Sequence, residues 1–114
     1  MSFIDANVIV YATIPDPHTE ESEMALLGGG FTNTIVLAEA HRAILKITKD
    51  RSVADDAINN TRKQLEIVSV TEDDISEALR HKELDIFDAI HVVTAHGNEF
   101  VTYDKKLKEY AKKR

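Results

Sequence analysis

The chain has 114 residues, of which 43% are hydrophobic and 30% charged. This balance is typical of a soluble protein with one core, so we expect a single domain over residues 1–114, located in the cytoplasm. The sequence contains no cysteine, which excludes a disulfide framework and zinc bound by cysteine. No apolar run approaches the roughly 20 residues that are needed to cross a bilayer.

The formal net charge of −6 is unevenly distributed along the chain. Residues 104–114 carry six basic and two acidic side chains, whereas the other 103 residues carry eight basic and 18 acidic ones. A polyanion would approach the basic end and be repelled elsewhere, unless cations neutralise the acids. A solvated C-terminal helix explains the basic end equally well.

Strand and helix patterns alternate along the chain, which favours an α/β fold with a parallel sheet. The expected strands are short and apolar, at residues 2–5, 31–33, 66–70 and 100–103. The expected helices lie within residues 16–30, 35–47, 52–65, 71–84, 86–96 and 104–114. Periodicity alone does not decide whether "VIVYA" is a strand or a helix. If the first strand ends at Asp5, we expect "VIVYA" to begin a helix.

Local signals predict where two of these helices begin. Asp16 is expected to cap the first of them, with Pro17 in the first helical position and Gly28 at the exit. Ser52 and Asp55 resemble a capping box at the start of a later helix.

Four carboxylates stand in unusual places for charged groups. Asp5 lies inside the apolar run "FIDANVIVYA", where an unpaired charge is costly unless a strand ends there or the charge is offset. Asp88 belongs to a helix that is apolar nearly all round, so we expect it to be partly desolvated. Asp104 follows the last strand, and Glu39 lies at the margin of an apolar helix stripe. Each position alone also fits a turn, a cap or a rim residue.

Taken together, the four acids indicate a metal site. Asp5 and Asp104 end expected strands, and we place Glu39 and Asp88 in the first turns of helices that begin at the same sheet edge. In open α/β sheets, ligands bind in the crevice at this edge. Carboxylates that converge there repel one another unless a cation binds them. Oxygen-only ligand sets suit Mg²⁺ or Mn²⁺, which activate water in phosphoryl chemistry.

The segments "FIDANVIVYA", "IVLAEAHRAI", "DIFDAIHVVTA" and "FVTYDKKL", in this order, resemble the four motifs of the PIN-domain ribonucleases, including the compact VapC-type toxins. The resemblance covers nearly the whole chain. It implies a three-layer α/β/α fold with a central parallel sheet. The family usually has a further strand after the last motif, but "KKLKEYAKKR" contains no apolar run. We therefore expect four strands, or five if one is supplied otherwise.

The resemblance implies a metal-dependent endoribonuclease that uses Mg²⁺ or Mn²⁺. It assigns the catalytic and metal-binding roles to Asp5, Glu39, Asp88 and Asp104. Three further polar residues are accessory candidates: Asn7, Asp85 and Thr102. The candidates for binding the RNA backbone are Lys105, Lys106 and Lys108. Tyr103 and Tyr11 are candidates for stacking on a base.

A toxin-like role implies three kinds of partner. The first is the RNA substrate, whose identity the sequence does not reveal. The second is a small antitoxin protein that presents arginine or lysine to the acidic residues. The third is a second copy of the chain, because the family tends to form homodimers and the chain has many apolar helix faces.

Other hydrolase classes fit the sequence less well. A haloacid-dehalogenase-like phosphatase needs a second acid where this chain has Asn7. A response-regulator receiver needs an aspartate after the third strand, where this chain has Thr71. His91 and His96 do not share a helix face for zinc, so the histidines are interpreted as ordinary surface or core residues. A non-catalytic PIN-like module that binds RNA or protein remains the alternative.

Overall fold

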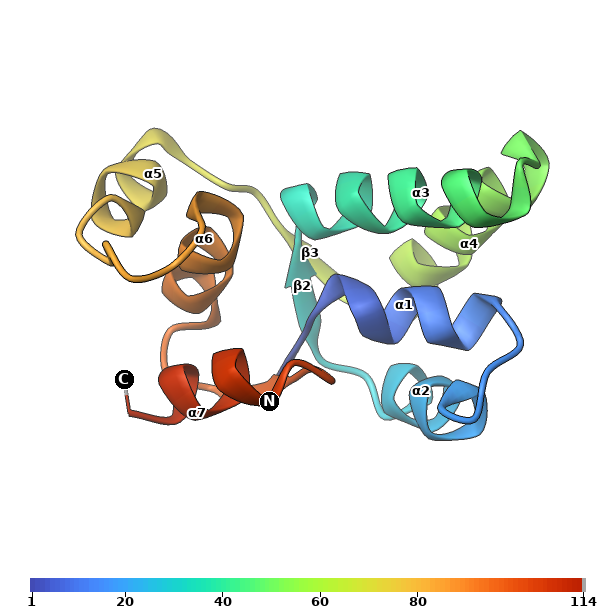
Figure 1. Cartoon of the computed structure of the whole chain (residues 1–114), viewed down its shortest axis with the longest axis horizontal. Helices are drawn as coiled ribbons and strands as arrows, with labels where there is room; N and C mark the ends of the chain where they lie inside the picture. Colours follow the sequence, from blue (N-terminus) through green and yellow to red (C-terminus); the bar gives the residue numbers. More distant parts are fainter. Residues whose placement is uncertain (114) are drawn as a thin grey trace.

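The computed structural model describes residues 1–113, in which strands and helices alternate (Figure 1). The strands are β1 (Ser2–Ile4), β2 (Phe31–Asn33), β3 (Glu66–Val68) and β4 (Glu99–Val101). The helices are α1 (Ala6–Thr13), α2 (Thr19–Leu27), α3 (Thr34–Thr48), α4 (Arg51–Gln64), α5 (Glu72–Ala78), α6 (Ile86–Ala95) and α7 (Lys105–Lys112). Residue 114, the last of the expected C-terminal helix, lies outside the described residues.

The four strands form one parallel sheet in the order β3-β2-β1-β4. Phe3 of the central strand β1 pairs with Phe31 on one side and Phe100 on the other. The ring centroids of these neighbours lie 5.5 and 5.1 Å from that of Phe3, and all three side chains are buried. The centre of the core is therefore an aromatic row that runs across the sheet.

Helices cover both faces of the sheet, which confirms the expected three-layer α/β/α arrangement. The chain first runs outward from β1 through β2 to β3, and helices α1 to α4 lie on one side of the sheet (Figure 1). It then returns across the sheet through α5 and α6 to β4, on the other side of β1. This reversal places a topological switch point between β1 and β4. Open α/β folds bind ligands at the carboxyl ends of the strands beside such a point, and we refer to this part of the molecule as the crevice.

Asp5 marks the change from strand to helix. β1 ends at Ile4, and the Asp5 carboxylate accepts a hydrogen bond of 2.8 Å from the N–H of Ala6, as the N-cap of α1. The segment "VIVYA" is therefore helical, and it buries Val8 and Ile9 in the core.

The start predicted for α2 is wrong by two residues, since the helix begins at Thr19 and not at Pro17. The Asp16 carboxylate accepts from the N–H of His18, and its carbonyl accepts from the N–H of Thr19. These bonds close a turn before the helix, which begins at Thr19 with no side-chain cap. Pro17 therefore precedes the helix, although Gly28 is the C-cap as predicted.

The capping box predicted at Ser52 is also wrong. Asp50 is the N-cap of α4, and its carboxylate accepts from the N–H groups of Ser52 and Val53. Asp55 instead bonds to the side chains of Arg51 and His41. Asp50 thus takes the N–H of Ser52, which the predicted box would have paired with the Asp55 carboxylate.

Several elements are shorter than expected. Helix α5 ends at Ala78, because the N–H groups of Arg80 and His81 bond to carbonyls three residues back and close turns. The strands β3 and β4 end at Val68 and Val101, since their neighbours in the sheet are themselves only three residues long. Within residues 1–113 the sheet has four strands and no fifth. None of the helices in this range combines the length and the hydrophobicity of a membrane-spanning segment.

Candidate active site

Asp5 lies at the base of the crevice, at the carboxyl end of β1. Its side chain is only 8% exposed, and its second oxygen accepts a hydrogen bond of 2.8 Å from the Thr102 hydroxyl. Burial raises the pKa of the Asp5 carboxyl above its usual value, and the bond from Thr102 opposes this rise. Asp5 is therefore a carboxylate that costs energy to ionise in the metal-free protein.

The Thr102 hydroxyl connects the ends of β1 and β4. Besides donating to Asp5, it accepts from the side-chain amide of Asn7 at 3.0 Å and from the N–H of Asp104 at 3.1 Å. The Asn7 carbonyl oxygen accepts in turn from the N–H of Tyr103 at 3.3 Å. Asn7 and Thr102, predicted as accessory residues, thus hold the β4–α7 turn against the start of α1.

Asp104 and Asp85 are both helix caps. The Asp104 carboxylate accepts from the N–H of Leu107 at the start of α7, and its side chain is exposed. The Asp85 carboxylate accepts from the N–H of Phe87 at the start of α6 and is exposed too. Each of these acids therefore has a local structural role, and the site role predicted for it stays a prediction.

Asp88 lies in the first turn of α6 and is half-buried. Burial, followed by the negative charges of Asp5 and Asp85, raises its pKa to about 6, and Asp104 adds to the effect. These carboxylates therefore share one electrostatic environment, although they come from three separate parts of the chain. The expectation that Asp88 is partly desolvated is confirmed.

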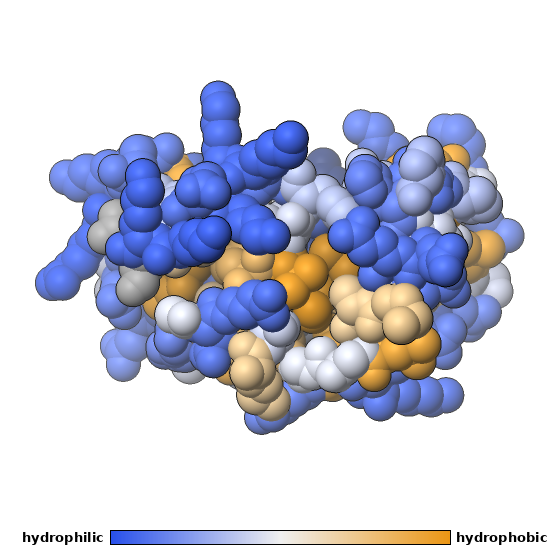
Figure 2. All heavy atoms as spheres, turned by 90° about the horizontal axis from the view of Figure 1, so that it is seen from below, coloured by the Kyte–Doolittle hydropathy of each residue, from blue (hydrophilic) through white to orange (hydrophobic). Residues whose placement is uncertain are grey.

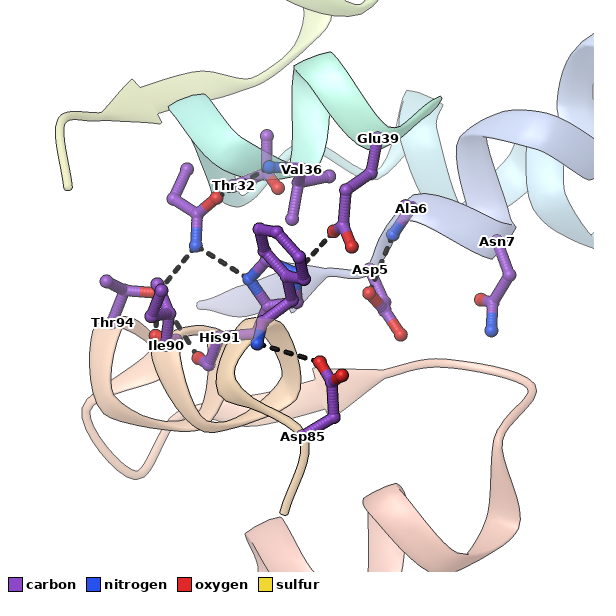
Figure 3. Close-up of polar contacts among 12 residues, drawn as sticks. Asp5, Ala6, Asn7, Thr32, Val36, Glu39, Asp85, Ile90, His91 and Thr94 are labelled. Carbon is purple, nitrogen blue, oxygen red and sulfur yellow. Dashed lines mark hydrogen bonds and ion pairs between the residues drawn. The ribbon is translucent and has the colours of Figure 1, made fainter. Parts of the chain in front are cut away.

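Glu39 enters the crevice from α3. It lies in the second turn of that helix, which begins at Thr34, so the prediction of a first-turn position is wrong. Its Oε1 atom lies 2.6 Å from Nε2 of His91, and its carboxylate is turned toward Asp5 (Figure 3).

Sequence reasoning missed two residues beside the site. His91 is 1% exposed and lies between Glu39 and the side chain of Asn33, which is fully buried. Two signals were available in the sequence. His91 follows Asp88 by three residues, which places both on one helix face. Asn33 directly precedes an apolar periodic segment, the usual place of an N-cap.

The chemistry of these residues fits a hard divalent cation. Asp5 and Asp88 both have a raised pKa, and a bound cation relieves the burial and repulsion that cause it. Among residues 1–113 no three acidic or histidine side chains already form an ion cage. Mg²⁺ typically keeps several waters and binds one or two protein carboxylates, so such a cage is not required. Asp5 and Asp88 are the first candidates to hold the ion.

The predicted RNA-binding lysines lie in two places. Lys105 and Lys106 occupy the first turn of α7, directly after Asp104. Lys108 lines a hollow of about 510 Å³ with Gly97 and Phe100, at the start of β4 rather than at its carboxyl end. Only the first two lysines are therefore next to the acidic crevice.

The two predicted stacking residues belong to an aromatic cluster. The ring centroids of Tyr11 and Tyr103 are 5.3 Å apart, and His18 lies 4.3 Å from Tyr103. The Tyr103 hydroxyl is 2.8 Å from the hydroxyl of the buried Ser22. The cluster thus anchors α2 to the turn that carries Asp104, and base stacking by its rings stays a prediction.

Fold and site define the chain as a doubly wound α/β protein with an acidic crevice at its topological switch point. The model of the PIN domain family matches residues 2–113, and the chain belongs to this family. This confirms the family that the four sequence motifs indicated. No curated protein matches the chain by sequence.

Solved structures with the same fold include VapC-type proteins and a toxin–antitoxin complex. VapC20 of Mycobacterium tuberculosis, described as a sarcin–ricin loop cleaving toxin, has a TM-score of 0.80 and 16% identity over 96% of this chain and 95% of its own. A toxin–antitoxin complex from Klebsiella pneumoniae has a TM-score of 0.69 and 20% identity, over 93% and 88% of the two chains. VapBC2 from Rickettsia felis, bound to a DNA fragment from the promoter, has a TM-score of 0.65 and 21% identity, over 95% and 91%.

Proposed function

We propose that the protein is an endoribonuclease that hydrolyses RNA phosphodiester bonds with Mg²⁺ or Mn²⁺. The observation that carries the proposal is the pair Asp5 and Asp88. These two carboxyls come from separate elements of the switch-point crevice, and both have a raised pKa. Carboxylates that are costly to ionise in a cleft are typical of functional sites, and a cation offsets the cost. The PIN family and the toxin VapC20 among its structural neighbours support ribonuclease chemistry.

The residues of the crevice have different roles in the proposed reaction. A bound divalent ion makes water a stronger nucleophile and stabilises charge on the phosphoryl group. Asp5 and Asp88 hold the ion, and Glu39 and Asp104 complete its acidic surroundings. Thr102 keeps the Asp5 carboxylate oriented through its hydrogen bond of 2.8 Å.

RNA reaches the site along the start of α7. Lys105 and Lys106 are exposed and directly follow Asp104, so they can contact RNA phosphates beside the scissile bond. They also offset part of the repulsion between the acidic protein surface and the RNA backbone.

The test is cleavage of structured and single-stranded RNAs with Mg²⁺, with Mn²⁺ and with EDTA. We expect cleavage that depends on the metal and is abolished by EDTA. Asp5→Asn should reduce it by orders of magnitude. Asp56→Asn, which removes the same charge from an exposed position on α4, should leave it unchanged. Absence of EDTA-sensitive cleavage of every RNA would favour the non-catalytic module that binds RNA or protein.

We further propose that the protein is the toxin of a toxin–antitoxin pair and binds a small antitoxin. Two of its structural neighbours are toxin–antitoxin structures, which supports this partner. A small protein encoded next to this chain should bind it and suppress cleavage when the two are produced together. If the antitoxin presents arginine or lysine to the crevice, Glu39→Ala should weaken the complex. Unchanged affinity would exclude that mode of binding.

We also propose a homodimer. The face of the molecule on the side of α2 and α7 carries a band of apolar atoms between hydrophilic margins (Figure 2). Large apolar side chains are exposed on α2 as well, at Met24 and Leu27. Sedimentation at micromolar concentration should show a species of twice the chain mass of 12.8 kDa. A single species of the chain mass would contradict the proposal.

A further inference from the structure

We propose that His91 is a positioning residue, which holds the Glu39 carboxylate in the acidic crevice, and that Asn33 sets the ring tautomer this requires. The inference rests on the proposed metal-dependent function and concerns residues that surround the four acids. His91, Asn33 and Thr94 are each at most 1% exposed. They form a buried polar chain that ends at Glu39 (Figure 3).

The orientation of the Asn33 side-chain amide follows from its place as the N-cap of α3. Its Oδ1 atom accepts from the N–H of Val36 at 2.7 Å, which only the oxygen of the amide can do. Its Nδ2 atom must then face the other way, toward Oγ1 of Thr94 at 2.9 Å and Nδ1 of His91 at 3.0 Å. The Thr94 hydroxyl donates to the carbonyl of Ile90, so its oxygen is free to accept from Asn33.

The tautomer of His91 follows from that orientation. Because the Asn33 amide nitrogen donates, Nδ1 of His91 has to accept and carries no proton. The ring proton is therefore on Nε2, which donates to Oε1 of Glu39 at 2.6 Å. The ring packs against the buried Phe3, with 6.0 Å between the ring centroids, so it has little freedom to turn.

Glu39 needs this support more than Asp5 or Asp104 does. Its side chain is 34% exposed, and the only hydrogen bond to its carboxylate in the described residues is the one from His91. Asp5 and Asp104, in contrast, are fixed as helix caps. With Oε1 held by a buried donor, Oε2 remains available to a cation or its waters. Partners of this kind orient metal-binding carboxylates, and their loss typically weakens metal binding about 10–100-fold.

Two substitutions of His91 separate positioning from packing. Glutamine places its amide nitrogen close to the position of Nε2, so His91→Gln retains a donor to Glu39. Asparagine places its amide close to Nδ1, so His91→Asn retains a partner for Asn33 but does not reach Glu39. By calorimetry on the full chain, His91→Asn should bind Mn²⁺ about 10–100-fold more weakly, and His91→Gln within a few-fold of the parent. Equal losses in both variants would overturn the proposal.

A second background tests whether His91 acts through Glu39. In Glu39→Ala, the addition of His91→Asn should cause no further loss of Mn²⁺ affinity, because the group that His91 positions is already gone. Additive losses would show that His91 supports the site by packing alone and would overturn the proposal. RNA cleavage by the same variants should follow the Mn²⁺ affinities.

The tautomer can be checked in the parent protein without any substitution. Nitrogen NMR of the histidine rings should show that His91 carries its proton on Nε2, and Mg²⁺ should shift that resonance. A ring protonated on Nδ1 would overturn the inference. A parent that binds Mn²⁺ but cleaves no RNA would overturn the proposed function alone. A parent that binds no divalent ion would overturn both.

Discussion

Two opposing effects act on the pKa of Asp88: burial with nearby negative charges raises it, and the helix N-terminus lowers it. It lies three residues after the cap Asp85, where a carboxylate favours the positive end of the helix dipole. Its pKa is nevertheless raised to about 6, because burial and the charges of Asp5 and Asp85 outweigh that effect. The folded protein therefore holds a proton that the unfolded chain releases between the ordinary aspartate pKa and about 6. This contribution to stability is lost as the pH rises through about 6.

Replacing Asp88 should show how its charge affects stability and metal binding. Without metal, Asp88→Asn should be as stable as the parent near neutral pH or slightly more so, and should show a smaller fall in stability between about pH 4 and 6. The thermal shift caused by millimolar Mn²⁺ should shrink or vanish, and cleavage should fall by orders of magnitude. Melting curves of both proteins, with and without Mn²⁺, provide the measurement. A variant that loses about 0.5–2 kcal/mol and keeps the full Mn²⁺ shift would instead show that Asp88 serves only to stabilise the start of α6.

Thr102 illustrates how one hydroxyl organises several groups. Thr102→Val removes the donor to Asp5 and the acceptor for Asn7 and Asp104 while keeping a similar volume. We expect a loss of about 1–3 kcal/mol in the free energy of unfolding, because buried polar groups are left without partners. Thr102→Ser, which retains the hydroxyl, is the matched control for chemical denaturation. Equal stability of the two variants would contradict this role.

At the scale of elements, two adjacent glycines permit the approach of β2 to β1. Gly29 and Gly30 both have positive φ angles, of 79° and 114°. A Cβ atom on Gly30 would lie 2.4 Å from the carbonyl oxygen of Ser2, whereas one on Gly29 would meet nothing within 4 Å. Gly30 is therefore needed for space as well as for its backbone conformation.

Alanine at each position separates these two requirements. Gly29→Ala should cost about 1 kcal/mol, the strain of a positive φ angle alone. Gly30→Ala should cost about 2–4 kcal/mol, because the clash with β1 adds to that strain. Urea denaturation of the two variants measures the difference. Similar losses would show that the contact with Ser2 relaxes at little cost.

At the scale of the whole molecule, the charge distribution decides how a polyanion approaches. Lys105 and Lys106 lie next to the acidic crevice on an otherwise acidic protein. Replacing both by alanine should weaken binding of single-stranded RNA, and should reduce the slope of log affinity against log salt by about 1.4, or 0.7 per lost phosphate contact. Lys46→Ala with Lys49→Ala, at the far end of α3, is the control of equal charge. Equal slopes for both pairs would exclude Lys105 and Lys106 from the RNA path.

The sequence by itself determined those features that depend on local order. The alternation of strand and helix, the family motifs and the position of Asp5 directly after β1 could all be predicted, because each follows from periodicity or from a cap within a few residues. Asp104 was expected directly after the last strand, but β4 ends at Val101, three residues earlier, and Asp104 caps α7. Local prediction failed where two caps were close together. At the start of α4, for example, the sequence analysis chose Ser52, whereas the N-cap in the structure is Asp50, two residues earlier.

Only the tertiary structure decided which distant groups meet. Glu39 and His91 are separated by 52 residues along the chain and are joined because α3 and α6 lie on opposite faces of the sheet and meet at the crevice. Lys108 and Lys105 are close in sequence, yet the direction of α7 carries Lys108 to the start of β4. No local pattern specifies such pairings, because they depend on how the chain reverses across the sheet. The acids were therefore predictable one by one, whereas the buried chain that orients Glu39 was not.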